Sequence, residues 1–215
     1  QLAGVAMYLL LRCRPESLLL LDDHRVLDLF SGLVLGLLVA FKPTLAVIPM
    51  LLTMAWIIDR RWRTLLTQGI AAVAAAGVAF VVGCRFLHSW SAWWDWKNAL
   101  PDLEKVSDVS VQIGNVSLAR VIREATSGPA GEGINLAPIL LILVLVLAAV
   151  ALLLTRRRWP GALSAADDRQ VWFERDFLVT ALGCTLSVVA LKLVWLHYYI
   201  LLIPLLLYVL RPGGW

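Results

Sequence analysis

Charged residues are scarce in this chain of 215 residues: Lys and Arg number 19, Asp and Glu number 15, and together they form 16% of the sequence. Hydrophobic residues account for 60%, more than a water-soluble domain of this size normally tolerates. The composition excludes an ordinary soluble domain and predicts a multi-pass membrane protein. The net charge of +4 does not indicate nucleic-acid binding, because the arginines gather at the ends of apolar runs, where orientation in a membrane explains them.

Cysteine and histidine are also rare, with three residues of each type. Cys13, Cys84 and Cys184 lie far apart, in or beside apolar segments, and form no CxxC or Cys/His pattern. Metal and redox sites need such spacing, so we expect packing cysteines, no metal site and no cofactor. The chain also lacks an initiator Met and the basic start of a signal peptide. We therefore expect these residues to be part of a longer protein.

Long apolar runs are what the sequence does contain. Only helices satisfy the backbone of such runs in a membrane without closing a barrel. We therefore predict an all-α fold, a polytopic transmembrane helix bundle that forms one domain over residues 1–215. The predicted membrane segments are 1–11, 26–41, 44–58, 65–87, 136–154, 177–196 and 198–210.

The arginines predict how these segments are oriented. Alternate threading places most of them, including those of the loop 156–176, on one side, which is cytoplasmic by the positive-inside rule. The other side receives Lys42 and the loop 88–135, which holds four basic and six acidic residues. This extracytoplasmic loop is too long for a passive connector and is predicted to contribute to a site.

Lys42 and Pro43 separate two apolar runs that are each too short to cross a bilayer squarely. The runs 26–41 and 44–58 reach about 24 Å and 22 Å as helices, against a hydrocarbon core of about 30 Å. Lys42 is therefore predicted to lie below the membrane surface and to face a protein interior or a wet cavity, where it suits an anionic lipid headgroup. The alternative is a Lys that extends to the interface.

Four tryptophans follow the segment 65–87. In one interpretation they form an aromatic belt at headgroup depth; in the other, one or two rings stack on a sugar or hold a lipid chain, with Asp95 and Lys97 beside them. The four are Trp90, Trp93, Trp94 and Trp96.

Polar residues at 115–120 form a second candidate site. Asn115 or Ser117 is expected to cap a helix, whose free N–H groups attract an anion such as phosphate. Arg120 could add donors for the same anion. The alternative is an exposed Arg without a specific contact.

Lys192 and His197 form a third candidate. His197 stands between two apolar runs, where it could bond a substrate hydroxyl or, when protonated, a phosphate. The alternatives are a His bonded to a backbone carbonyl and a Lys that extends to the interface.

Three motifs resemble those of bacterial membrane mannosyltransferases of glycosyltransferase family 87. Residues 32–43 resemble the family's glycine-rich helix and Lys-Pro turn. Residues 115–120 resemble its Asn-Gln-Ser-Leu segment, with Val116 in place of Gln. Residues 195–199, followed by 203–205, resemble its Trp-x-His-His/Tyr stretch before a Leu-Pro-rich helix.

The resemblance implies a GT-C-like fold and an enzyme of the bacterial plasma membrane. It would move a sugar, typically mannose, from a polyprenyl-phosphate donor to a glycolipid or cell-envelope glycan on the extracytoplasmic face. Lys42, Arg120, Lys192 and auxiliary His197 would stabilise the departing phosphate, and Asn115, Ser117 and Tyr198 would join the binding site. The base, a carboxylate that drives an inverting transfer, is expected upstream of this chain.

Two other functions remain open from the sequence. In a transporter or lipid flippase, Lys42, Lys192 and His197 would line the path, and pseudo-symmetric halves would be expected. In a non-catalytic membrane subunit, the loop 88–135 would dock a partner.

Overall fold

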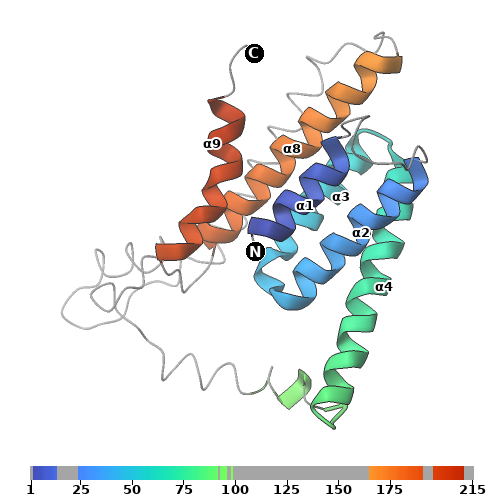
Figure 1. Ribbon diagram of the computed structural model, residues 1–215, viewed down its shortest axis with the longest axis vertical. Helices are drawn as coiled ribbons and strands as arrows, with labels where there is room; N and C mark the ends of the chain where they lie inside the picture. Colours follow the sequence, from blue (N-terminus) through green and yellow to red (C-terminus); the bar gives the residue numbers. More distant parts are fainter. Residues whose placement is uncertain are drawn as a thin grey trace, which may run out of the picture.

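The computed structural model describes residues 2–13, 24–91, 93–95, 98, 165–190 and 196–210. All regular secondary structure in these ranges is helical, which confirms the predicted all-α class. The elements are α1 (Leu2–Cys13), α2 (His24–Phe41), the 3-10 helix η1 (Pro43–Ala46), α3 (Val47–Ile58), α4 (Trp62–Phe86), α8 (Ala165–Ala190), the 3-10 helix η3 (Leu196–Leu202) and α9 (Ile203–Val209). Figure 1 shows them as a bundle beyond which one end of α4 projects.

α2 packs along α4 through two glycines one turn apart. A Cβ at Gly32 would lie 2.5 Å from the Gln68 carbonyl oxygen, and one at Gly36 would clash with the backbone of Ala72. Such close approach through small residues spaced by four is typical of membrane helix pairs. Gln68 Nε2 also donates to Asp28 Oδ1 at 3.2 Å. These contacts fix α2, and with it the turn at its C-terminal end.

α3 supplies much of the buried core. It packs against α8, where Gly183 lies close to the backbone of Ile48. Cys84 and Cys184 are buried free thiols, which confirms the packing role expected of these two. The core side chains include Val5, Tyr8, Ile48, Leu51, Leu52, Ala55, Trp56, Val179, Cys184 and Leu201.

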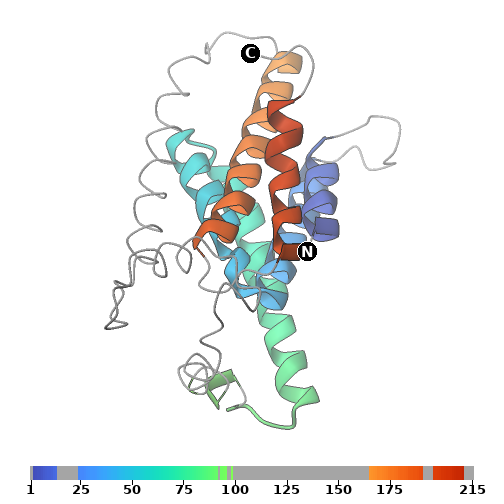
Figure 2. The same ribbon diagram turned by 90° about the vertical axis from the view of Figure 1, so that its left-hand side faces the viewer.

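α4 is the one helix in the described ranges that is long and apolar enough to cross a membrane, with a mean hydropathy of 2.1. Its far half projects beyond the bundle in both views (Figures 1 and 2), and Val78, Val81 and Val82 are exposed there. Shorter apolar helical stretches cover Val26–Phe41, Pro43–Ile58 and Tyr198–Leu210. The segment 136–154 lies outside the described residues, so the seven-segment arrangement stays a prediction.

α8 differs most from the sequence expectation. The predicted membrane segment starts at 177, after a loop, whereas the helix begins at Ala165. Hydropathy finds only the apolar part of this helix, because the preceding part contains charged residues. Arg175 and Asp176 belong to that part, and both are buried. Residues 165–176 are therefore helical rather than a loop.

Candidate functional site

The break between α2 and α3 follows from Pro43. A residue before proline avoids the α region, and Lys42 is accordingly extended, with φ −146° and ψ 90°. α2 therefore ends at Phe41, and the Lys42 amide still donates to the Leu38 carbonyl at 2.9 Å. The Lys42 carbonyl accepts a bond from the Leu45 amide at 2.9 Å, at the start of η1. The predicted break at this position is confirmed.

The Lys42 side chain contacts an aromatic ring from near the other end of the chain. Its Nζ lies 3.5 Å from the centroid of the Tyr198 ring, which belongs to η3. The negative face of an aromatic ring attracts a cation in this geometry. Lys42 is half-buried, so part of its charge is shielded from water. The fold thus brings two residues of the predicted substrate-binding set into contact.

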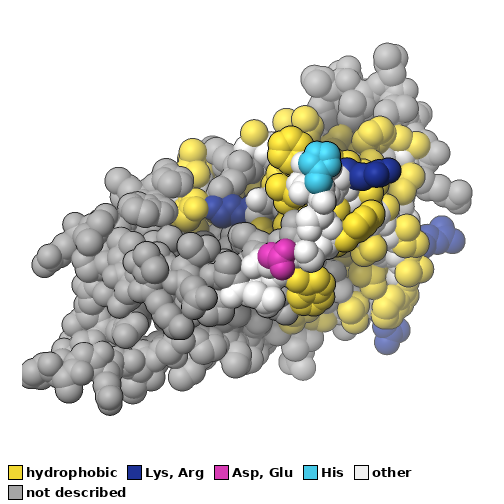
Figure 3. All heavy atoms as spheres, turned by 90° about the horizontal axis from the view of Figure 1, so that it is seen from below, with side chains coloured by type: hydrophobic (Ala, Val, Ile, Leu, Met, Phe, Trp, Pro, Cys, Tyr) yellow, Lys and Arg dark blue, Asp and Glu magenta, His cyan; other side chains and the backbone are white. Residues whose placement is uncertain are grey.

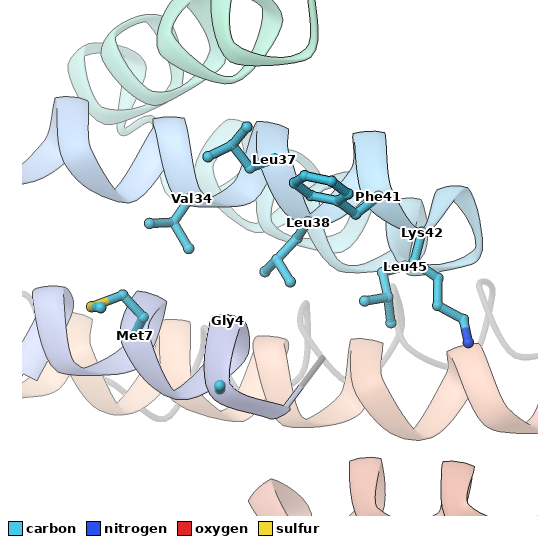
Figure 4. Close-up of a pocket in the computed structure, with 9 residues that line it drawn as sticks. Gly4, Met7, Val34, Leu37, Leu38, Phe41, Lys42 and Leu45 are labelled. Carbon is cyan, nitrogen blue, oxygen red and sulfur yellow. The ribbon is translucent and has the colours of Figure 1, made fainter. Parts of the chain in front are cut away.

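An apolar groove leads to Lys42. It has a volume of about 590 Å³ and lies between α1 and the α2–η1 turn. Figure 4 shows Val34 and Leu38 pointing from α2 toward Gly4 and Met7 of α1. Among the described residues that line the groove, Lys42 is the charged one. An apolar groove with a cation at one end matches an amphiphile with an anionic headgroup.

The remaining predicted site residues are described in part or not at all. His197 precedes Tyr198 in η3, but its side chain lies outside the described part. No three His, Cys, Asp or Glu residues converge within the described ranges, so these supply no set of metal ligands. Also outside the description are Trp96, Lys97, Asn115, Ser117, Arg120 and Lys192.

At the C-terminal end of α3, the buried carboxylate of Asp176 from α8 accepts three hydrogen bonds. Arg61 Nη1 and Nη2 donate to the two oxygens of Asp176 at 2.8 and 3.3 Å. Trp56 Nε1 donates to Asp176 Oδ1 at 3.1 Å. The guanidinium carbon of Arg61 also lies 4.9 Å from the ring centroid of Trp172. These contacts join the α3–α4 turn to α8.

A second ion pair lies beside the first. Arg175 Nε and Asp59 Oδ2 are 2.5 Å apart, and both side chains are 2% exposed. Burial raises the pKa of Asp59, while attraction to Arg175 and then Arg61 lowers it by less. The sequence predicted only that Arg61 and Arg175 mark the cytoplasmic side of the membrane. The signal that could have revealed the pairs is the carboxylate near each Arg, since Asp59 lies two residues before Arg61 and Asp176 follows Arg175.

The tryptophans after α4 divide into packed and exposed rings. Trp93 stacks on Phe80 of α4, with centroids 5.9 Å apart and ring planes at 26°. Gly83 leaves room for this ring, because a Cβ there would lie 3.1 Å from it. Trp90 and Trp94 are 65% and 63% exposed.

A protein-family model identifies the family to which this chain belongs. The model of glycosyltransferase family 87 matches residues 2–168, well over half of the 215 residues. The chain belongs to glycosyltransferase family 87. As a member of this family it is a glycosyltransferase, which uses a sugar donor and an acceptor. The match includes α1 to α4 and the Lys42 groove, whereas Tyr198 lies beyond it.

Comparison with curated proteins and with solved structures found no further relative. No curated protein and no solved structure matches the chain. The family match confirms the resemblance to glycosyltransferase family 87 and does not favour a transporter or flippase. It includes the motifs at 32–43 and 115–120, whereas the motif at 195–199 lies beyond it.

Proposed function

We propose that this family 87 glycosyltransferase transfers a sugar, mannose by its motif resemblance, from a polyprenyl-phosphate donor to a glycolipid or cell-envelope glycan. The reaction takes place on the extracytoplasmic face of the bacterial plasma membrane, in a multi-pass protein. The observation that carries the proposal is the apolar groove that ends at Lys42 (Figure 4). A polyprenyl-phosphate sugar presents an apolar chain and then an anion, in the order that the groove and Lys42 require.

Lys42 is suited to the phosphate that departs in this reaction. The bond between the anomeric carbon and the phosphate oxygen breaks while an acceptor oxygen bonds to the same carbon, with inversion. The leaving phosphate gains negative charge, which a cation held in place stabilises. The Tyr198 ring can hold the ammonium group without neutralising it, because the ring has no formal charge. Partial burial strengthens the attraction, since the effective dielectric constant is lower than in water.

Other predicted residues complete the proposed site. Arg120, Lys192 and His197 add hydrogen-bond donors to the phosphate, with His197 auxiliary to catalysis. We expect Asn115 or Ser117 to cap a helix whose free amides attract the anion. The acceptor hydroxyl loses its proton to a carboxylate that we expect in a preceding part of the enzyme.

Lys42→Met tests the proposal, because it removes the charge and nearly preserves the length of the side chain. We expect transfer from a polyprenyl-phosphate sugar by the full-length membrane protein to fall ten-fold or more, which corresponds to about 1.4 kcal/mol. Lys42→Arg should retain more activity than Lys42→Met. Arg63→Gln, an exposed position at the start of α4, is the matched control and should transfer at the wild-type rate. Wild-type turnover by Lys42→Met would overturn the role of Lys42.

A further inference from the structure

A turn that includes Ser91 and Asp95 follows α4. The Asp95 amide donates to the Ser91 carbonyl at 2.9 Å, and Ser91 Oγ donates to Asp95 Oδ2 at 2.8 Å. Ser91 also receives support from Ser89, since the two hydroxyl oxygens lie 2.9 Å apart. Trp90 immediately precedes this turn and Trp94 lies within it. Two indoles thus share one short segment with a hydroxyl and a carboxylate.

Trp93 anchors this turn to α4. Trp93 stacks on Phe80 and fills the space beside Gly83. Because Trp93 makes this packing contact, the turn keeps its place while Trp90 and Trp94 remain largely exposed. Trp90 and Trp94 therefore present exposed rings on a turn that is held in place.

The chemistry of this turn matches a sugar. One face of a pyranose ring presents C–H groups that can stack on an indole, which has a large apolar face. Its hydroxyl groups can donate to a carboxylate and exchange bonds with a serine hydroxyl. We propose that Trp90, Trp94, Ser91 and Asp95 form a binding platform for a hexopyranose ring. The assignment of this ring to a substrate rests on the proposed glycosyl transfer.

The position of the platform favours the acceptor glycan over the donor sugar. The α2–η1 turn and the far end of α4 lie toward the same end of the molecule, and α4 reaches farther out (Figures 1 and 2). On that end, an acidic side chain lies next to hydrophobic ones (Figure 3). The donor sugar is attached directly to the phosphate and must stay near Lys42. A platform farther out suits another sugar of the acceptor.

An aromatic belt explains this arrangement less well. A belt needs indoles at headgroup depth, but it needs no carboxylate beside them. Asp95 is exposed, and its charge would be repelled by the phosphates of the headgroups. The bond from Ser91 to Asp95 instead fixes the carboxylate on the same turn that carries Trp94. That pairing of a polar group with an aromatic ring is what a sugar requires.

The experiment measures sugar binding separately from transfer. Methyl glycosides of mannose, glucose and galactose are titrated into the purified full-length protein while tryptophan fluorescence is recorded. We expect a saturable change with at least one of them. The change should disappear in the double variant Trp90→Leu/Trp94→Leu and require at least ten-fold more sugar in Asp95→Asn. Trp62→Leu removes a 52% exposed tryptophan at the opposite end of α4 and should keep the response.

Steady-state kinetics then identify which substrate provides the sugar. The double variant should raise the KM for the acceptor at least ten-fold and leave the KM for the donor unchanged. A rise in the donor KM alone would overturn the acceptor assignment. If the double variant does not fold, Trp90→Phe/Trp94→Phe replaces it, with a smaller rise expected.

Two results would overturn the platform itself. One is the absence of a saturable response to all three glycosides together with unchanged KM values in the variants. The other is quenching of Trp90 and Trp94 by lipids brominated in their acyl chains, without any response to sugar, which would make them a membrane belt. Neither result contradicts the proposed glycosyl transfer if Lys42→Met still loses activity. The two proposals can therefore fail separately.

Discussion

The two ends of α3 hold their charged side chains in different ways. At the C-terminal end, Arg61 and Arg175 each contact a buried carboxylate. At the N-terminal end, Lys42 contacts the neutral ring of Tyr198, and no carboxylate among the described residues forms an ion pair with it. A cation paired with a carboxylate has little attraction left for a ligand, whereas one held by a ring keeps its charge available. The comparison separates charges that are paired within the fold from a charge that can bind substrate.

The largest effect on stability should come from removing a carboxylate at the C-terminal end of α3. Asp176→Asn leaves Arg61 without its counter-charge at a site where Asp176 is 1% exposed. Removing one partner of a buried pair typically costs about 3 kcal/mol or more. We expect a loss of this size in the free energy of unfolding, measured by denaturation of the detergent-solubilised protein. Lys42→Met should lose about 1 kcal/mol or less, because it removes only a cation–π contact.

Arg63→Gln is the control for this stability measurement, since its side chain is exposed and surface changes usually stay within about 0.5 kcal/mol. If Asp176→Asn were no more destabilising than Arg63→Gln, the paired charges would not stabilise the fold and the comparison would fail.

A smaller effect should come from the ring that holds Lys42. Tyr198→Leu removes the aromatic face, whereas Tyr198→Phe keeps it. A cation–π contact contributes about 1 kcal/mol, so we expect Tyr198→Leu to raise the KM for the donor about five-fold. Tyr198→Phe should stay within about two-fold of the wild type if the ring face alone matters. Equal losses in the two variants would show that the hydroxyl group, rather than the ring, supports the site.

Local sequence chemistry was enough to predict the break at Lys42. Pro43 disfavours a helical conformation at the preceding residue, so the ends of α2 and η1 follow from two neighbouring residues. The apolar runs around them likewise correspond to α2 and α3. The contact between Lys42 and Tyr198 could not be predicted in the same way, because it depends on how η3 packs against the rest of the bundle.

The start of α8, in contrast, could not be predicted from local sequence chemistry. Hydropathy marks a helix only where the residues are apolar, and the first part of α8 holds Arg175 and Asp176. These two are buried because Asp59 and Arg61 of the α3–α4 turn neutralise them. Their role depends on residues more than a hundred positions away, so the sequence indicated a polar loop where the fold has a helix. The arginines that marked the cytoplasmic side in the sequence also stabilise the tertiary structure.

The smallest effect concerns Asp59 and its response to pH. Aspartate ordinarily ionises near 3.8, and burial raises the pKa of Asp59 above that value despite the neighbouring Arg175. Between these two pKa values the folded state binds more protons than the unfolded state, so the free energy of unfolding falls as pH rises through this window. Asp59→Asn removes the titration. The stability of the wild type relative to this variant should therefore decrease from about pH 4 upward, as measured by denaturation at several pH values. If the relative stability of the wild type increased with pH instead, attraction to Arg175 would outweigh burial at Asp59. Both ion pairs would then favour folding through the attraction between their charges.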